Sequence, residues 1–281
     1  MEQPTRPRRS VLYMPGANRR ALEKARTLPA DGLIFDLEDA VAPEAKPAAR
    51  AAVAAALAAG GYGRRELVLR VNPPASPWGA DDLAAAAAMP LDAVLLPKVE
   101  SAAEAAAAAA RLPGRPIWCM IETPRGVLAA AEIAAAPQVA ALVMGTSDLG
   151  KELRARETAD RLALLPALGL VLLAARAQGI AALDGVHLDL ADADGFTAAC
   201  RQGRALGFDG KTLIHPNQIA AANAAFGPDA AEVAQARRLI AAYEAARAAG
   251  QGIVVVDGRL VENLHVAEAR RILALAAAID A

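Results

Sequence analysis

Short apolar segments of β character alternate with longer alanine-rich helical segments along most of the 281 residues. No other feature of the sequence restricts the fold as much. Strands that alternate with helices form parallel pairs joined by crossover helices. The predicted strands are residues 10–14, 32–35, 66–71, 93–96, 116–121, 141–144, 181–183 and 207–214. Eight such repeats predict an α/β fold, a closed (β/α)₈ TIM barrel.

The helical segments between these strands support the same fold. They are predicted at residues 19–27, 46–59, 81–88, 101–111, 127–136, 161–177 and 193–206. An open, doubly wound sheet would show a similar alternation, but its first strand is usually followed by a GxGxxG turn. Here that turn reads Pro15-Gly16-Ala17-Asn18, so the closed barrel is favoured.

The pattern changes after Pro216. Helical stretches at about residues 217–225 and 229–249 lead to a short apolar run at 253–256 and a final helix at about 266–279. This tail is too small for a domain of its own. We therefore divide the chain into a TIM-barrel catalytic domain, residues 1–216, and a C-terminal helical extension, residues 217–281. The extension is expected to cover the site or to reach a neighbouring subunit.

Charge and composition narrow the class of partner. The chain has 31 acidic and 30 basic residues, which gives no sign of a nucleic-acid or anionic-membrane surface and favours a small molecule. Cys119 and Cys200 are far apart and form no CxxC motif, so a reducing cytoplasm is expected. The longest apolar stretch, residues 163–175, contains a proline and a glycine and is too short to span a bilayer.

Three carboxylates end the second predicted strand, in the sequence Asp36-Leu37-Glu38-Asp39. An isolated motif of this kind is as often a solvated loop or a helix cap. Packing alone does not favour charge at the end of a buried strand, and such charge suits a site that holds a cation, a basic group or a mobile proton. The functional interpretation gains weight because polar residues also follow most of the other strands.

In a TIM barrel the carboxyl ends of all strands meet at one face, so these polar residues should converge. They are Arg70 and Asn72, Lys98 and Glu100, Glu122 and Thr123, Gly145-Thr146-Ser147-Asp148, Asp184 and His215. Ligands rich in oxygen, without paired histidines, favour Mg²⁺, with Mn²⁺ as the alternative.

Adjacent predicted strands carry Glu122 and Asp148, which can therefore meet at one metal ion. Arg70 and Lys98, with the carboxylates that follow the second strand, are left for the substrate and the surroundings of the metal. The amides and hydroxyls of Gly145, Thr146 and Ser147 could bind a small carboxylate.

Two segments carry a family resemblance, RRSVLYMPG at residues 8–16 and FDLEDAV at residues 35–41. They resemble the citrate lyase β-subunit-like family, within the HpcH/HpaI aldolase superfamily. Further matches follow in order, and the resemblance covers roughly residues 8 to 279. They are LRVN from Leu69, LPK from Leu96, IET from Ile121, GTSDL from Gly145, DGV from Asp184, GFDGK from Gly207 and IHP from Ile214.

The resemblance implies a Mg²⁺-binding TIM barrel, usually a homotrimer or hexamer. Members of the family make or cleave C–C bonds in citryl, malyl, citramalyl and related thioesters of CoA or a carrier protein. By position, Glu122 and Asp148 match the metal ligands and Arg70 matches the arginine that contacts substrate. Glu38 and Asp39 match acidic residues that hold metal-bound water or position the ligand.

The malyl- and citramalyl-CoA lyase branch places an aspartate in its C-terminal tail, after a Gly-basic-aliphatic turn, and this aspartate reaches a neighbouring subunit. Here residues 258–261 match the turn, and Glu262 stands where the family usually has Asp. The carboxylate is kept with one more methylene.

The reaction implied is a retro-Claisen cleavage of a 3-hydroxyacyl thioester to a 2-oxo acid and an acyl-CoA. Arg70 would offset the negative charge that develops, and Glu262, or Glu38 through a water, would transfer the proton. With Asp39, these are the predicted catalytic residues. Lys98 is expected to pair with the substrate.

Three alternatives stay open. A metal-dependent pyruvate aldolase of the HpaI type would use a histidine near the early strands, whereas His187, His215 and His265 are all late. A Schiff base on Lys98 is less favoured than a role for this lysine as a charge beside the substrate. The barrel could also bind an oxo acid or an acyl-CoA without turning it over.

Overall fold

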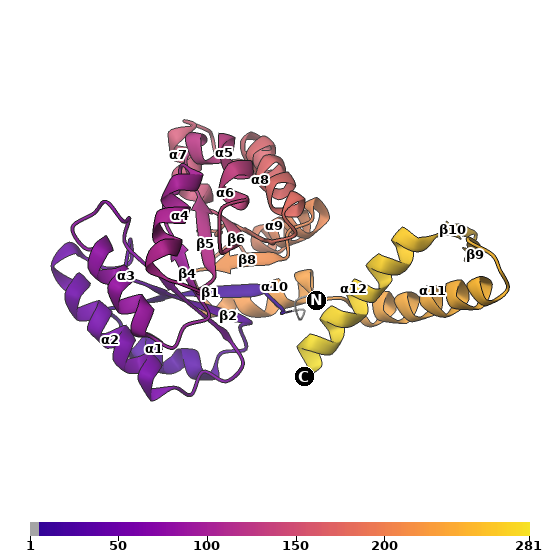
Figure 1. Cartoon of the computed structure of the whole chain (residues 1–281), viewed down its shortest axis with the longest axis horizontal. Coiled ribbons are helices and arrows are strands. Elements are labelled where there is room, and N and C mark those ends of the chain that lie inside the picture. Colours follow the sequence, from indigo (N-terminus) through magenta and orange to yellow (C-terminus); the bar gives the residue numbers. More distant parts are fainter. Residues whose placement is uncertain (1–5) are drawn as a thin grey trace. The chain divides into compact units, whose positions relative to one another are not determined.

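Eight parallel strands close into a barrel in the computed structural model, which describes residues 6–281 (Figure 1). Each strand pairs with the next one in the sequence, and β1 pairs with β8 to complete the barrel. The strands are β1 (Ser10–Pro15), β2 (Gly32–Asp36), β3 (Glu66–Arg70), β4 (Ala93–Leu96), β5 (Ile117–Ile121), β6 (Val139–Met144), β7 (Ala181–Asp184) and β8 (Gly210–Leu213). The predicted TIM barrel is confirmed.

Helices surround this barrel, as Figure 1 shows for the segment from α1 to α9. They are α1 (Arg19–Lys24), α2 (Lys46–Ala59), α3 (Gly79–Ala88), α4 (Ala102–Arg111), α5 (Pro124–Leu128), α6 (Ala130–Ala134), α7 (Thr146–Glu152), α8 (Leu165–Ala177), α9 (Ala193–Leu206) and α10 (Ile219–Phe226). Short 3₁₀ helices occur at Ala25–Thr27, Pro43–Ala45, Leu162–Leu164 and Pro216–Gln218. Within residues 6–281 no helix has the length and apolar character that a membrane span needs.

Three local differences from the sequence prediction have physical causes. The helix expected at residues 127–136 is divided into α5 and α6 at Ala129, whose backbone leaves the helical region. Strand β8 starts at Gly210 rather than 207, because Gly207 adopts a φ of 111° that ends α9. The polar segment from Thr146, for which no helix was predicted, forms α7.

The interior of the barrel is filled by aliphatic side chains and one large aromatic ring. Trp118 is fully buried there, with Ile34, Val68, Leu95 and Val143 among its neighbours in one core cluster. Only 3% of the residues are aromatic, so branched and small aliphatic residues supply the remaining volume. A filled interior leaves the ends of the strands as the place where a ligand can bind.

Residues 226–281 form a compact unit separate from residues 8–225. In it, α11 (Ala230–Ala248) packs on α12 (Asn263–Asp280), and an antiparallel hairpin joins them, β9 (Val254–Val256) with β10 (Arg259–Val261). Asp257 and Gly258 both have positive φ, as a two-residue hairpin turn requires. Tyr243, Val261 and Val266 are the buried centre of this unit.

Candidate active site

The guanidinium group of Arg70 joins the carboxyl ends of the first three strands. It donates from Nε and Nη2 to the two carboxylate oxygens of Asp36, both at 2.7 Å. These residues end β3 and β2 and stand opposite each other in the strand register. Nη1 lies 2.8 Å from Glu38 Oε2 and 3.4 Å from Asp39 Oδ2. The ring of Tyr13, from β1, lies 4.9 Å from the guanidinium carbon.

Arg70 is only 8% exposed, so its charge depends on these partners. Burial would lower the pKa of Arg70, but Tyr13, Asp36 and Glu38 raise it well above the ordinary arginine value. The guanidinium is therefore a permanent cation whose donors are directed mainly at the protein's own carboxylates. Its predicted contact with substrate stays a prediction, and its observed contacts position the carboxylates of Asp36 and Glu38.

The carboxylate-rich turn after β2 is held from two sides. Asp36 Oδ1 accepts a hydrogen bond from the backbone N–H of Glu38 at 2.9 Å. The buried ammonium of Lys46, at the start of α2, donates to the carbonyls of Leu37 and Glu38 at 3.0 and 2.9 Å and to Asn72 Oδ1 at 2.6 Å. These contacts fix the backbone of Glu38, so its side chain has a defined direction.

Lys46 and Asp82 are supporting residues that sequence reasoning missed. Asp82, fully buried in α3, accepts from the side-chain amide of Asn72 at 2.6 Å and from Arg50 Nε at 2.7 Å. Asp82 follows Asp81 at a helix start and is typical of an N-terminal cap there. Lys46 stands among alanines near the start of a predicted helix. Neither position carries a periodic signal for burial.

Three carboxylates from different segments converge on the ammonium group of Lys98. Its Nζ lies 2.6 Å from Glu38 Oε1, 3.4 Å from Asp148 Oδ2 and 4.0 Å from Glu122 Oε1. The backbone of Lys98 has a φ of 51°, and its N–H donates to Glu122 Oε1 at 2.7 Å. The structure thus brings together Glu38, Lys98, Glu122 and Asp148, four of the residues predicted from the strand ends.

Burial sets the proton affinity of two of these carboxyls. It raises the pKa of Glu122 to about 7, with Lys98 opposing the shift and Glu38 adding to it. Burial also raises the pKa of Glu38, although Arg70 and Lys98 counteract it. The pKa of Lys98 itself is raised, because its bond to Glu38 outweighs its burial. A carboxyl whose pKa is about 7, as that of Glu122 is, can exchange protons near neutral pH.

Gly145 makes room for the Glu122 carboxylate. A Cβ atom at Gly145 would lie 2.3 Å from Glu122 Cβ and 2.6 Å from Glu122 Oε2, which no real contact permits. Gly145 is also the N-cap residue of α7, and Asp148 is the third residue of that helix. A glycine at this point therefore lets the carboxylates that follow β5 and β6 share one space.

The donor set suits a hard divalent cation. Glu122 and Asp148 both lie within 4.0 Å of the Lys98 ammonium, so this space already favours positive charge. Among residues 6–281 there is no group of three or more His, Cys, Asp or Glu side chains placed to hold one ion. Mg²⁺ commonly uses one or two protein carboxylates and completes its coordination with water and substrate, so the two carboxylates fit it.

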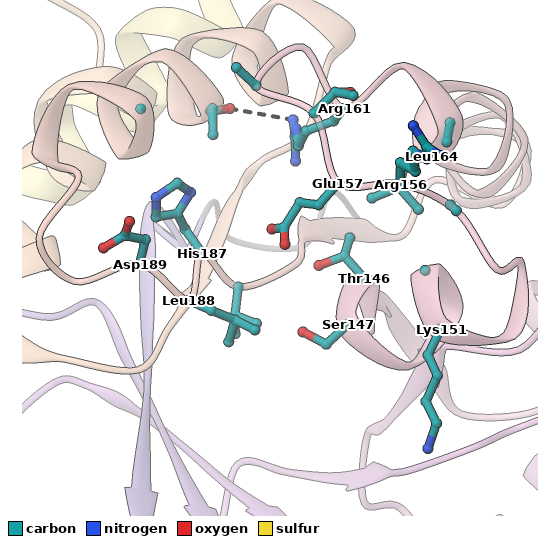
Figure 2. A pocket seen from close by; sticks show the side chains of 18 of the residues that line it. Thr146, Ser147, Lys151, Arg156, Glu157, Arg161, Leu164, His187, Leu188 and Asp189 are labelled. Carbon is teal, nitrogen blue, oxygen red and sulfur yellow. Dashed lines mark hydrogen bonds between the residues drawn. The ribbon is translucent and has the colours of Figure 1, made fainter.

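A cavity of about 970 Å³ lies along α7 and the segment that follows β7 (Figure 2). Thr146 and Ser147, two of the predicted carboxylate-binding residues, line it and direct their hydroxyls into it. Lys151 and Arg156 line the same cavity. The segment Gly145–Asp148 therefore has one side at the carboxylate cluster and another at a space large enough for part of a substrate.

Two other polar strand ends have structural partners. Asp184 is fully buried, pairs with Lys211 at 3.0 Å and accepts from Arg161 Nη1 at 2.8 Å. Its charge is therefore balanced within the protein by two residues, Arg161 and Lys211, that line the cavity along α7. His215 Nδ1 accepts from the N–H of Asn217 at 3.2 Å and stabilises the turn there. Glu262 is exposed at the start of α12, in the unit formed by residues 226–281.

Comparison with known families identifies the class of protein that this barrel and its carboxylate cluster define. The chain belongs to the HpcH/HpaI aldolase/citrate lyase family, whose profile matches residues 9–216. The predicted family is confirmed. Among curated relatives, a (3S)-malyl-CoA thioesterase of Cereibacter sphaeroides is 53% identical, over 100% of this chain and 99% of the relative. The citrate lyase subunit beta of Escherichia coli is 37% identical, over 98% and 95%.

Solved structures give the same relationship. The CitE protein of Mycobacterium tuberculosis in complex with magnesium, acetoacetate and coenzyme A is 35% identical and superimposes with a TM-score of 0.80, covering 95% of this chain and 97% of CitE. A citrate lyase beta subunit from M. tuberculosis with oxaloacetate and magnesium is 37% identical, with a TM-score of 0.69, over 78% and 96%. Because the match to the CitE complex with coenzyme A covers 95% of this chain, it includes most of the C-terminal extension, residues 217–281.

Replacing Arg70 by methionine should destabilise the barrel strongly, because Asp36 and Glu38 would remain buried without their cation. We expect the free energy of unfolding to fall by about 3–5 kcal/mol, measured by urea denaturation. Arg125→Met, which removes an exposed pair with Glu100, should cost less than about 1 kcal/mol. Adding Asp36→Asn to Arg70→Met should recover part of the loss, and a loss equal to that of Arg125→Met would contradict the positioning role.

Proposed function

We propose that the chain is a divalent-metal-dependent enzyme that hydrolyses a malyl-type 3-hydroxyacyl-CoA thioester to the free hydroxy acid and CoA. The observation that carries the proposal is the convergence of Glu38, Glu122 and Asp148 on one cation, Lys98, in a chain that matches a (3S)-malyl-CoA thioesterase over its whole length. The substrate class is therefore inferred from the relatives, and the chemical roles are inferred from the carboxylates around Lys98.

We propose Glu122 and Asp148 as the residues that hold Mg²⁺, with Mn²⁺ as an alternative. The magnesium in the related structures supports this assignment. The bound ion would supply a Lewis acid that polarises the oxygens of the substrate. Thr146 and Ser147 would bind the substrate's free carboxylate by their hydroxyls and the adjacent amides of α7.

Glu38 is the residue we propose to move the proton. It is 5% exposed, its direction is fixed by the turn after β2, and burial raises its pKa, which favours a carboxyl that can accept a proton. In hydrolysis it would take a proton from the attacking water, the C–S bond would break, and the proton would pass to the sulfur of CoA. Lys98 would hold Glu38 in place and offset the negative charge that forms on the substrate.

C–C bond cleavage is the second candidate, favoured by the citrate lyase beta relatives and by the oxaloacetate-bound neighbour. In this reaction Glu38 would take the proton of the 3-hydroxyl, the bond between C2 and C3 would break, and the enolate of the acyl-CoA would be protonated. A 2-oxo acid and an acyl-CoA would result. Both reactions require the same cluster, and they differ in whether the proton is taken from water or from the substrate.

The roles predicted for Asp39 and Glu262 remain proposals. Asp39 is largely exposed at the edge of the Arg70 cluster, where it could order water or orient the ligand. Glu262 would act only from a neighbouring copy, as the resemblance implies, so its role depends on a homo-oligomer. Cytoplasmic localisation likewise stays a prediction.

Product analysis with malyl-CoA and Mg²⁺ separates the two reactions. We expect free CoA and malate for hydrolysis, whereas acetyl-CoA and glyoxylate would establish C–C cleavage instead. Citramalyl- and citryl-CoA should be tested in parallel. Activity that survives EDTA would contradict the metal-dependent proposal as a whole.

Two variants test the roles within the cluster. Glu38→Gln should lower turnover by roughly 10²–10⁴-fold, the usual contribution of a general acid or base, while it leaves Mg²⁺ affinity little changed. Asp148→Asn should weaken Mg²⁺ binding and activity together. Calorimetric titration measures the Mg²⁺ affinity of both variants. If Glu38→Gln lost Mg²⁺ affinity and Asp148→Asn kept it, these assignments would be excluded.

Mg²⁺ binding should also weaken as the pH falls below about 7. Burial raises the pKa of Glu122 to about 7 in the metal-free protein, and a carboxyl must lose its proton to bind a metal. The apparent affinity should therefore be roughly tenfold or more lower at pH 5.5 than at pH 7.5. The same raised pKa means that the stability of the metal-free protein falls as the pH rises from the ordinary glutamate value to about 7. An affinity that does not depend on pH would be incompatible with Glu122 as a ligand.

A further inference from the structure

The position of the Lys98 ammonium has a consequence for metal binding. It is placed among the oxygens of Glu38, Asp148 and Glu122 at 2.6, 3.4 and 4.0 Å, where a divalent cation bound to Glu122 and Asp148 would also be drawn. We propose that Lys98 is an internal counter-ion: it neutralises these carboxylates in the metal-free protein and competes with the metal for Glu122 and Asp148. The inference rests on the proposed metal role of that pair.

The distances indicate how the ammonium could yield. Its shortest contact is to Glu38, which is not one of the two proposed ligands, and its contacts to Asp148 and Glu122 are longer. The side chain of Lys98 is 40% exposed, so its flexible stem can move outward. Its backbone N–H donates to Glu122 Oε1 at 2.7 Å, a contact that does not involve the ammonium. The ammonium can therefore leave Asp148 and Glu122 while it keeps its bond to Glu38.

Charge removal at Lys98 should affect metal binding and metal-free stability in opposite directions. Without the ammonium, the two buried carboxylates of Glu38 and Glu122 and the half-exposed carboxylate of Asp148 repel one another, which destabilises the metal-free protein. The same change removes the positive charge that a divalent cation must displace, so the cation binds more tightly. A residue that merely organised the ligands would instead lose metal affinity when it was replaced.

The experiment compares the full-length wild-type chain with Lys98→Met, Lys98→Arg and, as a matched control, Lys151→Met. Lys151 is an exposed lysine on α7, the helix that carries Asp148. Calorimetric titration with MgCl₂ should show a Kd roughly tenfold or more lower for Lys98→Met. Lys98→Arg, which keeps the charge, and Lys151→Met, whose charge is screened by solvent, should stay near the wild-type Kd. In EDTA, Lys98→Met should unfold at a lower temperature than wild type, and Mg²⁺ should raise its unfolding temperature more.

The outcomes are distinguishable. If wild type and Lys98→Met bind Mg²⁺ with the same Kd, or if the variant binds it more weakly, Lys98 does not compete and the inference is overturned, while the metal site stands. If neither binds Mg²⁺ or Mn²⁺, the metal assignment itself fails and the inference fails with it. Should Lys98→Met not fold, the double variant Lys98→Met with Glu38→Gln keeps the net charge of the cluster and should still bind Mg²⁺ more tightly than wild type.

Discussion

The buried guanidinium of Arg70 is the interaction on which the rest of the site depends. A cation that is 8% exposed at the end of β3 requires carboxylates around it, and Asp36 and Glu38 meet that requirement. These contacts hold the turn after β2 in place. The guanidinium also lies over the ring of Tyr13, which connects it to the end of β1. Removing the arginine would leave two buried negative charges and would release the backbone that carries Glu38.

From Arg70 the charges alternate across the mouth of the barrel. Glu38 lies between Arg70 and Lys98, and Lys98 lies between Glu38 and the pair formed by Glu122 and Asp148. Burial raises the pKa of Glu122 to about 7, while the cations Lys98 and Arg70 oppose this shift and Glu38 adds to it. The alternation balances charge before any ligand is bound. In the proposed metal site, an entering cation would displace the Lys98 ammonium from Glu122 and Asp148.

Two kinds of bond cleavage are proposed for this site on the basis of its relatives and its geometry. Relatives of this chain include a malyl-CoA thioesterase and citrate lyase beta subunits, so closely similar barrels carry names for C–S and C–C bond cleavage. Both need a polarised oxygen and a carboxyl that moves one proton, and the cluster around Lys98 offers residues for both. The choice between them depends on whether water reaches the substrate, which makes product analysis the decisive measurement.

The amino-acid sequence by itself determined the barrel, because alternating strands and helices leave few ways to pair parallel strands, and it determined that polar residues gather at the strand ends. The motifs of the sequence also identified the family, and the strand ends identified Glu38, Lys98, Glu122 and Asp148 as candidate site residues. Only the tertiary structure decided which of these meet: Asp184, equally polar at its strand end, is neutralised by Lys211 and Arg161, and the isolated lysine at position 46 proves to support the Glu38 turn. Periodicity records which face of an element is buried, whereas the pairing of charges depends on distances between segments that lie far apart along the chain.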